Sequence, residues 1–499
     1  AALTSITTGN QNTVMGHSAG RNITTGTSNV IIGRVAGYAT TDVDKAVIIG
    51  EQAGYTGNMT SAADGTVSIG ANAGKNVTSA AESTFVGFGA GANVTTGNYN
   101  TAIGYNAGGQ AEDDTNNTFV GRYAGYAVES SENTFIGGDA GYGVQDGTTG
   151  SQNTAIGYRT MYNHTTANKN VAVGDQALQT LTTGNSNISI GMRASQYNTV
   201  GSNTVHIGTE AGRYATGSQN TFVGSDAGKG GQTSAPYSSG ENNVAVGYQA
   251  LDGFTTGGTN VAVGNSALGA LTTAVENVAI GHEALDSATT NGYNTVIGFN
   301  AGKGASNANY TYNVLIGRNA GKKSSGDGGD SLYNVGVGND VLTSLNGGDK
   351  NVAVGRASGD SITTGTNNVL LGYSTDISVS GGVDQIVIGP SLVGTANQRV
   401  HIGDDTSHIY NDFNSNATWT HSSDKRQKKD IEKDTLGLDF INDIEPVTYK
   451  HKSPSEFPKE WASYDENNTE PMGGDKTIHG LIAQNVKEAL DKQGVDTFG

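Results

Sequence analysis

Apolar and polar residues alternate in a short motif that recurs along most of the chain. One copy, Asn100–Gly104, reads N-T-A-I-G, and close copies run from Val14-Met15-Gly16 to His401-Ile402-Gly403. We call the last residue the closing glycine and count positions from it, so that Ile103 lies at position −1. The closing glycine occurs 23 times, most often 17 residues after the previous one. A period this short over about 400 residues predicts a mostly β chain folded as a parallel β-solenoid, whose coils bury their apolar side by stacking.

The letters of the motif predict which way each side chain points. Side chains alternate faces in a strand, so positions −1 and −3 share one face and position −2 takes the other. Position −1 is aliphatic or Met in every copy, as at Ile103 and Val173, and we expect positions −1 and −3 to face the interior. The glycine would supply a bend or a close backbone approach that a side chain would block. Runs such as Thr95–Gly97 mark a second corner, which gives two short strands and two turns per coil.

Position −4 is Asn in 17 copies, for example at Asn12, Asn220 and Asn351. Stacked asparagines can hydrogen-bond along the axis through their side-chain amides. Alternatively they only shape turns, because Asn tolerates left-handed backbone conformations. With about 4.8 Å per coil, 23 coils would form a rod of roughly 110 Å, the shape of a spacer.

Position −2 alternates between large and small residues along the rod. It is Phe in some coils and Ala in others, such as Ala102. If this position faces outward, the exposed rings cost about 25 cal/mol per Å² of apolar area. A parallel partner chain would cover them, and three-fold symmetry suits a fibre. The alternative is that the rings lie under their own turns. The phenylalanines concerned are Phe85, Phe119, Phe135 and Phe222.

Charge and composition exclude several classes of function. The net charge of −18 disfavours binding to nucleic acid or to an anionic membrane. With no cysteine, the chain has no disulfide or thiol chemistry. We find no apolar run that could span a bilayer and no signal peptide. The nine histidines include no pair at metal-ligand spacing, and Gly326–Asp330 is better explained as a surface loop than as a calcium turn, so we predict neither a metal site nor a cofactor.

The spacing between copies loosens from Gly224 to Gly338. The step to Gly247 is 23 residues, and further insertions follow. Insertions in a solenoid emerge as side loops, where binding residues tend to lie. Aromatic rings there could contact a glycan receptor, or they could pack on the rod. The candidate contacts are Tyr237, Tyr310, Tyr312 and Tyr333.

The composition changes after Gly403: residues 404–499 contain both tryptophans and 30 charged residues in 96, against 44 in the first 403. We predict a repeat shaft at 1–403, a neck at 404–422 and a small α+β domain at 423–499. Residues 436–444 have helical spacing, Val447–Tyr449 has strand character, and Ile478–Leu490 carries a helical apolar stripe.

The last domain carries three motifs in a specific order. These are Ser423-Asp424-Lys425-Arg426-Gln427-Lys428-Lys429-Asp430-Ile431, then Ile444-Glu445-Pro446-Val447-Thr448-Tyr449, then His479-Gly480-Leu481-Ile482-Ala483-Gln484. Together they resemble the endosialidase-type intramolecular chaperone, a self-cleaving serine peptidase module of phage tail fibres and tailspikes.

The resemblance implies that Ser423 is the nucleophile, that Lys428 is its general base, and that the Ser422–Ser423 bond is cut once. Lysine can act as a base only if burial lowers its pKa. The five-residue offset would separate the two side chains by about 140° on a helix. A turn between them, or a lysine from a neighbouring chain, is therefore needed. Lys425 and Lys429 are the alternatives to Lys428.

The repeats are similar, more loosely, to the β-roll of trimeric autotransporter adhesin heads, with Asn170–Gly174 and Asn277–Gly281 the closest copies. Together the two resemblances imply a homotrimeric phage tail fibre in the virion tail. Such a fibre would bind a host cell-surface receptor, with a glycan expected, and other virion tail proteins, and its chaperone would direct trimerisation. The alternatives are a tailspike that depolymerises polysaccharide and a bacterial surface adhesin.

Overall fold

The computed structural model describes residues 2–144, 148–305, 310–323, 329–413, 420–421, 436–460, 464–471 and 475–495. They belong to two compact units, Ala1–Ser422 and Ser423–Gly499. Each unit is described by itself below.

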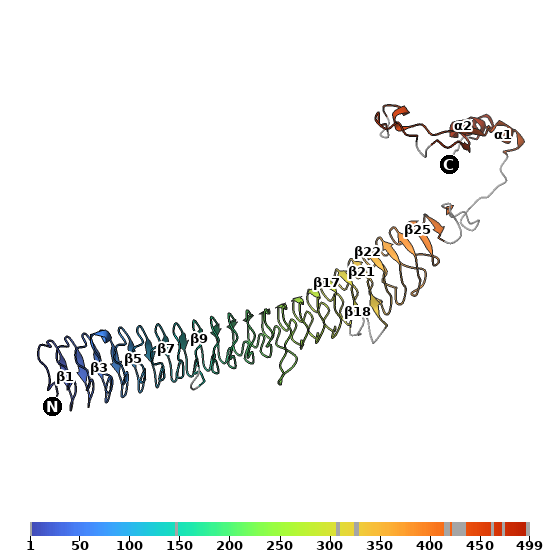
Figure 1. Cartoon of the computed structure of the whole chain (residues 1–499). Coiled ribbons are helices and arrows are strands. Elements are labelled where there is room, and N and C mark those ends of the chain that lie inside the picture. The colour runs from blue at the N-terminus through green and yellow to red at the C-terminus, as the bar shows by residue number, and fades with distance from the viewer. Residues whose placement is uncertain are drawn as a thin grey trace. The chain divides into compact units, whose positions relative to one another are not determined.

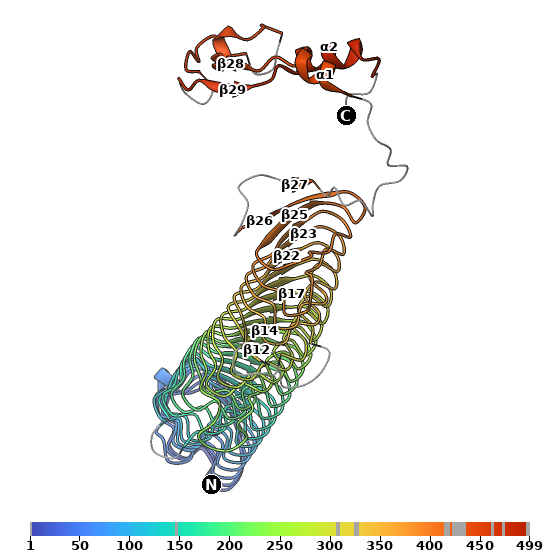
Figure 2. The same ribbon diagram turned by 90° about the vertical axis from the view of Figure 1, so that its right-hand side faces the viewer.

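The first unit is a parallel β-solenoid (Figure 1). Each coil contributes a short strand that ends just before or at its closing glycine. It pairs in parallel with the strand of the next coil, usually 17 residues on, as Thr101 does with Thr118. In the described part of the chain, 23 such strands enclose 22 turns of one continuous sheet. The predicted fold and period are therefore confirmed, and successive coils lie directly over one another (Figure 2).

The strands of the coils have the following bounds: β1 Thr13–Met15, β2 Val30–Ile32, β3 Val47–Ile49, β4 Val67–Ile69, β5 Thr84–Val86, β6 Thr101–Ile103, β7 Thr118–Val120, β8 Thr134–Ile136, β9 Thr154–Ile156, β10 Val171–Val173, β11 Ile188–Ile190, β12 Val205–Ile207, β13 Thr221–Val223, β14 Val244–Val246, β15 Val261–Val263, β16 Val278–Ile280, β17 Thr295–Ile297, β19 Val314–Ile316, β21 Val335–Val337, β22 Val352–Val354, β23 Val369–Leu371, β24 Ile386–Ile388 and β25 Arg399–Gly403. A one-turn 3-10 helix, η1 (Ser61–Ala63), lies between β3 and β4.

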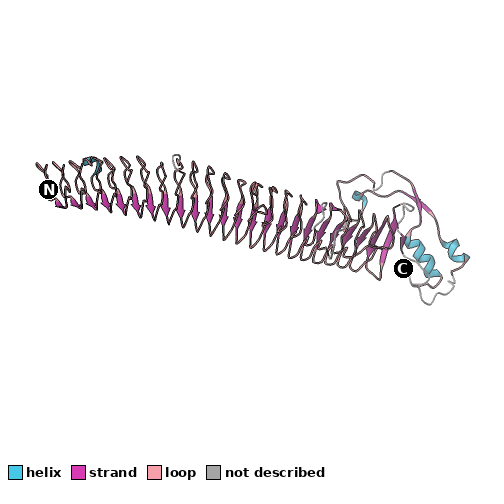
Figure 3. Cartoon of the chain, turned by 90° about the horizontal axis from the view of Figure 1, so that it is seen from below, coloured by secondary structure: helices cyan, strands magenta, loops and turns pink. Residues whose placement is uncertain are grey.

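The strands occupy one side of the solenoid and turns the other (Figure 3). The prediction of two strands per coil was thus wrong for most coils. Position +2 adopts a left-handed conformation, for example φ 50° at Asn106, so the chain bends instead of running extended. Backbone hydrogen bonds still join the turns of successive coils, as from Gly108 N to Ala124 O at 2.9 Å. A second pairing of named strands joins β18 (Tyr310–Thr311) to β20 (Ser331–Leu332).

The closing glycines form a column in which backbones touch. Gly104 has φ +140°, and a Cβ atom there would lie 2.4 Å from the carbonyl oxygen of Gly121. A side chain at this position would therefore clash with the next coil in an already unfavourable backbone conformation. The predicted close approach is confirmed.

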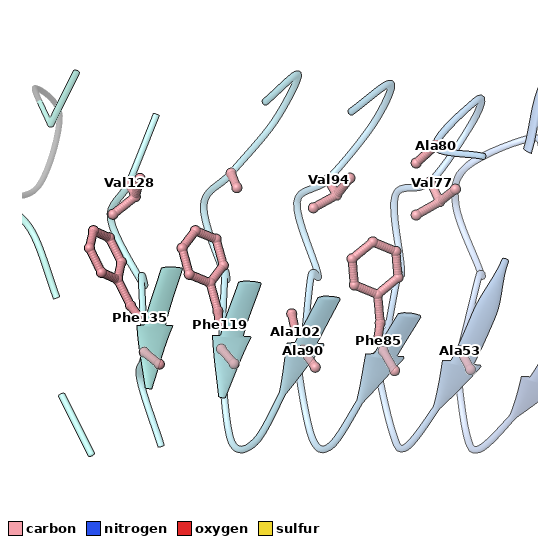
Figure 4. Close-up of a cluster of buried hydrophobic side chains, with 14 of the residues drawn as sticks. Ala53, Val77, Ala80, Phe85, Ala90, Val94, Ala102, Phe119, Val128 and Phe135 are labelled. Carbon is pink, nitrogen blue, oxygen red and sulfur yellow. The ribbon is translucent and has the colours of Figure 1, made fainter. Parts of the chain in front are cut away.

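The inward face is position −2, which corrects the prediction for positions −1 and −3. Phe85, Phe119 and Phe135 are at most 1% exposed and point from their strands into the interior (Figure 4). The aliphatic residues at position −1 lie on the outer side of the sheet, where Ile103 is 39% exposed. The alternative, that the rings lie under their own turns, is therefore right, and the phenylalanines need no partner chain to cover them.

The interior space of each coil is shared between positions −2 and +4. Where position −2 is Phe, position +4 is Gly, and a Cβ atom on Gly91 would lie 2.2 Å from Cδ1 of Phe85. Where position −2 is Ala, as at Ala172, position +4 can be a buried Leu such as Leu178. The two positions compensate in volume, which explains how a narrow core accepts both Phe and Ala.

The asparagines of position −4 form a buried hydrogen-bonded column, which confirms the first of the two interpretations. Asn277 N donates to Oδ1 of Asn260 at 3.1 Å, and Asn277 Nδ2 donates to the same oxygen at 3.1 Å. The backbone link repeats without interruption through nine asparagines and ends on Gln385: Asn220, Asn243, Asn260, Asn277, Asn294, Asn313, Asn334, Asn351 and Asn368.

The described end of the first unit is antiparallel. β26 (His408–Asp412) pairs with β25, and β27 (Thr420–His421) pairs with β26. The parallel coils therefore end in a short antiparallel ribbon within the segment predicted as a neck.

The second unit is small and mixed. It contains α1 (Leu438–Asp443), β28 (Val447–Tyr449), the 3-10 helix η3 (Pro454–Glu456), β29 (Ile478–Gly480) and α2 (Ala483–Lys492), and β28 pairs antiparallel with β29. The first helix and β28 lie where the sequence predicted them. The predicted helical stripe from Ile478 was wrong in its first part, because Ile478–Gly480 is taken up in the pairing with β28 and the helix begins at Ala483.

Candidate functional site

The predicted self-cleavage residues lie outside the described residues. These are Ser422, Ser423 and Lys428, together with the alternative bases Lys425 and Lys429. The boundary between the two compact units falls between Ser422 and Ser423. A cut at the predicted bond would therefore separate one whole unit from the other.

The second unit buries few apolar side chains in its described part. Ala489 and Leu490 are the buried apolar residues there, whereas Leu438 is 77% exposed and Ile441 61% exposed. An apolar groove of about 470 Å³ is lined by Ile441, Ile444, Pro446, His479, Gly480 and Leu481. As a single copy, the unit leaves the apolar side chains that could form its core in contact with solvent.

The outer side of the solenoid's sheet is uncharged and mostly aliphatic, with Thr at position −3 of eight coils. We define the aliphatic face as the residues at positions −1 and −3 of the 23 coils. Position −1 is always Met, Ile, Val or Leu, and position −3 is always Thr, Val or Ile. Eight isoleucines of position −1 are each 37–39% exposed: Ile103, Ile136, Ile156, Ile190, Ile207, Ile280, Ile316 and Ile402. Parallel sheets normally have both faces covered, so this face lacks its expected cover within one copy.

Tyr310 does not reach the surface, which corrects its prediction as a receptor contact. Its side chain is fully buried, and its hydroxyl donates to the carbonyl oxygen of Gly321 at 3.2 Å. Burial raises its pKa. The Nζ atom of Lys323 lies 5.3 Å from the ring centroid. The ring fills the interior at an insertion, so it is not available to a ligand outside the rod.

The other three predicted tyrosines lie on the surface in two groups. Tyr312 and Tyr333 are 46% and 51% exposed and stack in a row with Tyr293, with 4.9 Å between successive ring centroids. Both faces of Tyr312 are therefore covered by neighbouring rings, which leaves its edge for a ligand. Tyr237, in the 23-residue step between Gly224 and Gly247, stacks on Tyr197 at 5.0 Å. That loop packs back on the rod.

Four carboxylates line a groove of about 260 Å³: Glu112, Asp113, Asp114 and Glu129. Burial, with a smaller contribution from Glu129, raises the pKa of Asp114 to about 6. Hydrogen bonds from the Thr96 and Thr95 hydroxyls lower the pKa of Asp113. Neighbouring carboxyl groups with opposite shifts can hold one proton and one negative charge at the same pH.

A cluster of aromatic and charged side chains on five successive coils was not found from the sequence. All its members lie at positions +1, +2 or +5, on the turn after the closing glycine. We call it the tyrosine patch, and it consists of Phe88, Tyr105, Tyr123, Tyr126, Tyr142, Tyr158, Tyr162, Arg122, Asp139 and Arg159. Aligning the repeats on the closing glycine would have revealed it, because the same positions are mostly polar elsewhere.

Two serines and a histidine form a hydrogen-bonded row in the interior, and these residue types also occur in nucleophilic catalytic sites. Ser189 Oγ lies 2.6 Å from Ser195 Oγ, which lies 2.6 Å from His206 Nδ1. All three residues are fully buried, and burial lowers the pKa of His206 to about 3. No substrate can reach them. We therefore assign them a packing role, since Ser189 and His206 occupy position −2, where other coils have Phe or Ala.

Within the described ranges, no group of three or more His, Asp or Glu side chains is placed to hold a metal ion. Among the helices described, none has the length and apolar content needed to cross a bilayer.

The comparison with known families identifies the type of domain that the second unit forms. The family model described as chaperone of endosialidase matches residues 423–495. No curated protein matches the chain. The chain thus ends in an endosialidase-type chaperone domain, and this domain after a 22-turn β-solenoid fits a tail fibre or tailspike type of protein.

Proposed function

We propose that this chain is an attachment fibre of a tailed phage. Three parallel copies pack their aliphatic faces together, the rod reaches a receptor on the host cell, and the chaperone domain guides assembly before it cuts itself off. The observation that carries the proposal is the aliphatic face, together with the chaperone domain that follows it.

The size of the aliphatic face supports self-association. Eleven of the 23 side chains at position −1 are 37–63% exposed, and the other twelve are partly exposed. The sum is on the order of 1,000 Å², whereas soluble monomers rarely expose a contiguous apolar patch of more than a few hundred Å². A stable interface needs roughly 800 Å² from each partner. A second and third copy of the same face provide that area without any change in the coil.

The second unit supports the same conclusion independently. Its exposed Leu438 and Ile441 lie on α1, and Ile441 lines the apolar groove beside Leu481. Side chains of this kind form a core when copies of a small domain associate. A chaperone domain that is complete only in the assembly would couple folding of the fibre to its release.

Mass measurement under native conditions tests the assembly. Wild type should have three times the mass of the shaft fragment that remains after the cut. Ile190→Lys/Ile207→Lys, which places two charges on the aliphatic face, should shift the protein to monomer. Met192→Lys/Val200→Lys is the matched control, because these residues are 45% and 57% exposed but lie outside the aliphatic face. A monomeric wild type, or equal loss in both variants, would count against the proposal.

Denatured masses test the self-cleavage. Wild type should yield a shaft fragment that ends at Ser422, and Ser423→Ala and Lys428→Ala should remain intact, because the cut needs a nucleophile and a base. Lys429→Ala serves as the control and should still be cut. Equal cleavage of all four proteins would remove the dyad.

A second candidate, a tailspike that hydrolyses surface polysaccharide, is favoured by the carboxylate groove. Glycoside hydrolysis needs one protonated and one ionised carboxyl group, and the pKa shifts of Asp114 and Asp113 provide that difference. Release of reducing sugar by wild type and its loss in Asp114→Asn would favour this candidate. No release from the polysaccharides of cells that the fibre binds would exclude it.

A further inference from the structure

The tyrosine patch lies outside the core that the coil requires. In coils nearby, position +1 is Asp175, Thr209 or Ser225, so the fold accepts polar residues there. Phe88, at the same position, is nevertheless 50% exposed. Large exposed rings are not needed for stacking of the coils, and their concentration on five successive coils indicates a binding surface.

The rings of the patch meet one another at different angles. Phe88 and Tyr105 stack at 5.3 Å, but Tyr105 and Tyr123 meet at 85°. Tyr158 has a glycine, Gly138, at the equivalent position of the preceding coil. Tyr126, Tyr142 and Tyr162 of the patch do stack in a row, at 5.4 and 5.0 Å between successive centroids, as in the row around Tyr312. Tyr105 and Tyr158 lie outside that row. Exposed ring faces can accept the C–H face of a pyranose ring by apolar contact.

Polar groups within the patch are held in fixed positions. Arg122 Nη2 donates to both carboxylate oxygens of Asp139, at 2.9 and 2.8 Å, and Arg159 lies 3.8 Å from the same carboxylate. The Arg159 guanidinium also lies over the rings of Tyr158 and Tyr162, at 5.2 and 5.5 Å. The Arg122 and Arg159 side chains remain 56% and 43% exposed, so they keep donors free for sugar hydroxyls or a carboxylate.

The charge of the patch selects between possible ligands. Two arginines face one aspartate, which gives a local positive charge on a chain whose net charge is −18. A sugar polymer with scattered carboxylates is attracted to such a site. A single-stranded nucleic acid also stacks on aromatic rings, but it carries a charge on every nucleotide and is repelled by the acidic rod.

We propose that the tyrosine patch binds an acidic polysaccharide, with pyranose rings against Tyr105 and Tyr158 and sugar carboxylates on Arg122 and Arg159. This inference rests on the proposed attachment function and adds the site and the ligand class to it. It places the receptor contact on the turn that follows the closing glycine in coils β5–β9, on residues that are not part of the aliphatic face.

The test uses the whole protein on an array of purified bacterial surface polysaccharides, both neutral and uronic-acid-containing, with single-stranded oligonucleotides as a further arm. Wild type should bind at least one acidic polysaccharide, and Tyr105→Ala/Tyr158→Ala should weaken that binding at least tenfold. The matched control is Tyr248→Ala/Tyr373→Ala, because these tyrosines also lie at position +1 and are each 50% exposed. The control should bind within twofold of wild type.

Several results would overturn the proposal. They are an absence of polysaccharide binding by wild type, full binding by the patch variant, equal loss in the control, or preference for neutral polysaccharide or the oligonucleotide. Adsorption to the strains that supplied the polysaccharides separates this proposal from the attachment function. If wild type and patch variant adsorb equally, attachment stands and the patch is wrong. If wild type adsorbs to none of these strains, the attachment function itself fails.

Discussion

The shared interior of positions −2 and +4 makes a quantitative prediction. Phe85 is fully buried, so Phe85→Ala should lower the free energy of unfolding by about 4 kcal/mol. Gly91→Leu alone should cost about 3 kcal/mol, because its Cβ would lie 2.2 Å from the Phe85 ring. The double variant recreates the Ala and Leu pair of the Ala172 coil, where Leu178 adopts the same left-handed conformation with φ 49°. It should lose only about 1–2 kcal/mol, far less than the sum of the single changes.

Hydrogen exchange of peptides from β5 and β6 measures the local free energy of opening in each variant. The control pair is Phe85→Ala with Gly141→Leu. Gly141 faces Phe135 with the same geometry, since its Cβ would lie 2.2 Å from that ring, but it lies three coils away. The control pair should be additive within about 0.5 kcal/mol. If Phe85→Ala/Gly91→Leu is also additive, positions −2 and +4 do not share one space and the account of the core is wrong.

Three further predictions concern the interior of the rod. Burial lowers the pKa of His206 to about 3. As the pH falls below about 6.5, this histidine is therefore protonated in the unfolded chain but stays neutral in the folded coil, which destabilises the fold. Between pH 7 and pH 4.5, the free energy of unfolding of His206→Phe should therefore fall by roughly 2–3 kcal/mol less than that of wild type, as measured by urea unfolding at both pH values. Asn277→Ala should cost about 2 kcal/mol or more and speed exchange at Asn294, whose backbone donor loses its partner. Gly121→Ala should lower the free energy of unfolding more than Asn277→Ala and should accelerate exchange on both adjacent coils, because its Cβ would lie 2.4 Å from the Gly137 oxygen.

The period, the glycine column and the asparagine column could be predicted from the sequence because each repeats a local requirement of the backbone. The inward face could not be assigned from the motif alone, because positions −1 and −2 are both apolar in most coils. The information that decides the inward face is the correlation between positions −2 and +4, which are six residues apart: Phe222 accompanies Gly228, and Ala245 accompanies Leu251. A pair that compensates in volume must share the core.

The candidate contacts were harder to predict because they depend on how side chains from different coils meet. The insertions point to Tyr312 and Tyr333, which are exposed, but nothing local distinguishes them from Tyr310, which is buried close by. The tyrosine patch draws on three positions of five coils, so no single stretch of sequence contains it. The cleavage residues rest on a contiguous motif, and the family match at 423–495 supports that resemblance.

One measurement tests most directly whether copies of this chain associate through the aliphatic face. The chain has no cysteine, so Ile207→Cys introduces a single thiol on that face. If three parallel copies pack there in register, equivalent thiols meet at the same height, and mild oxidation should yield a chain of twice the mass under denaturing conditions. Val200→Cys, on the turn side, should give no such product. Failure of the Ile207 variant to cross-link, or equal cross-linking of both variants, would contradict the account.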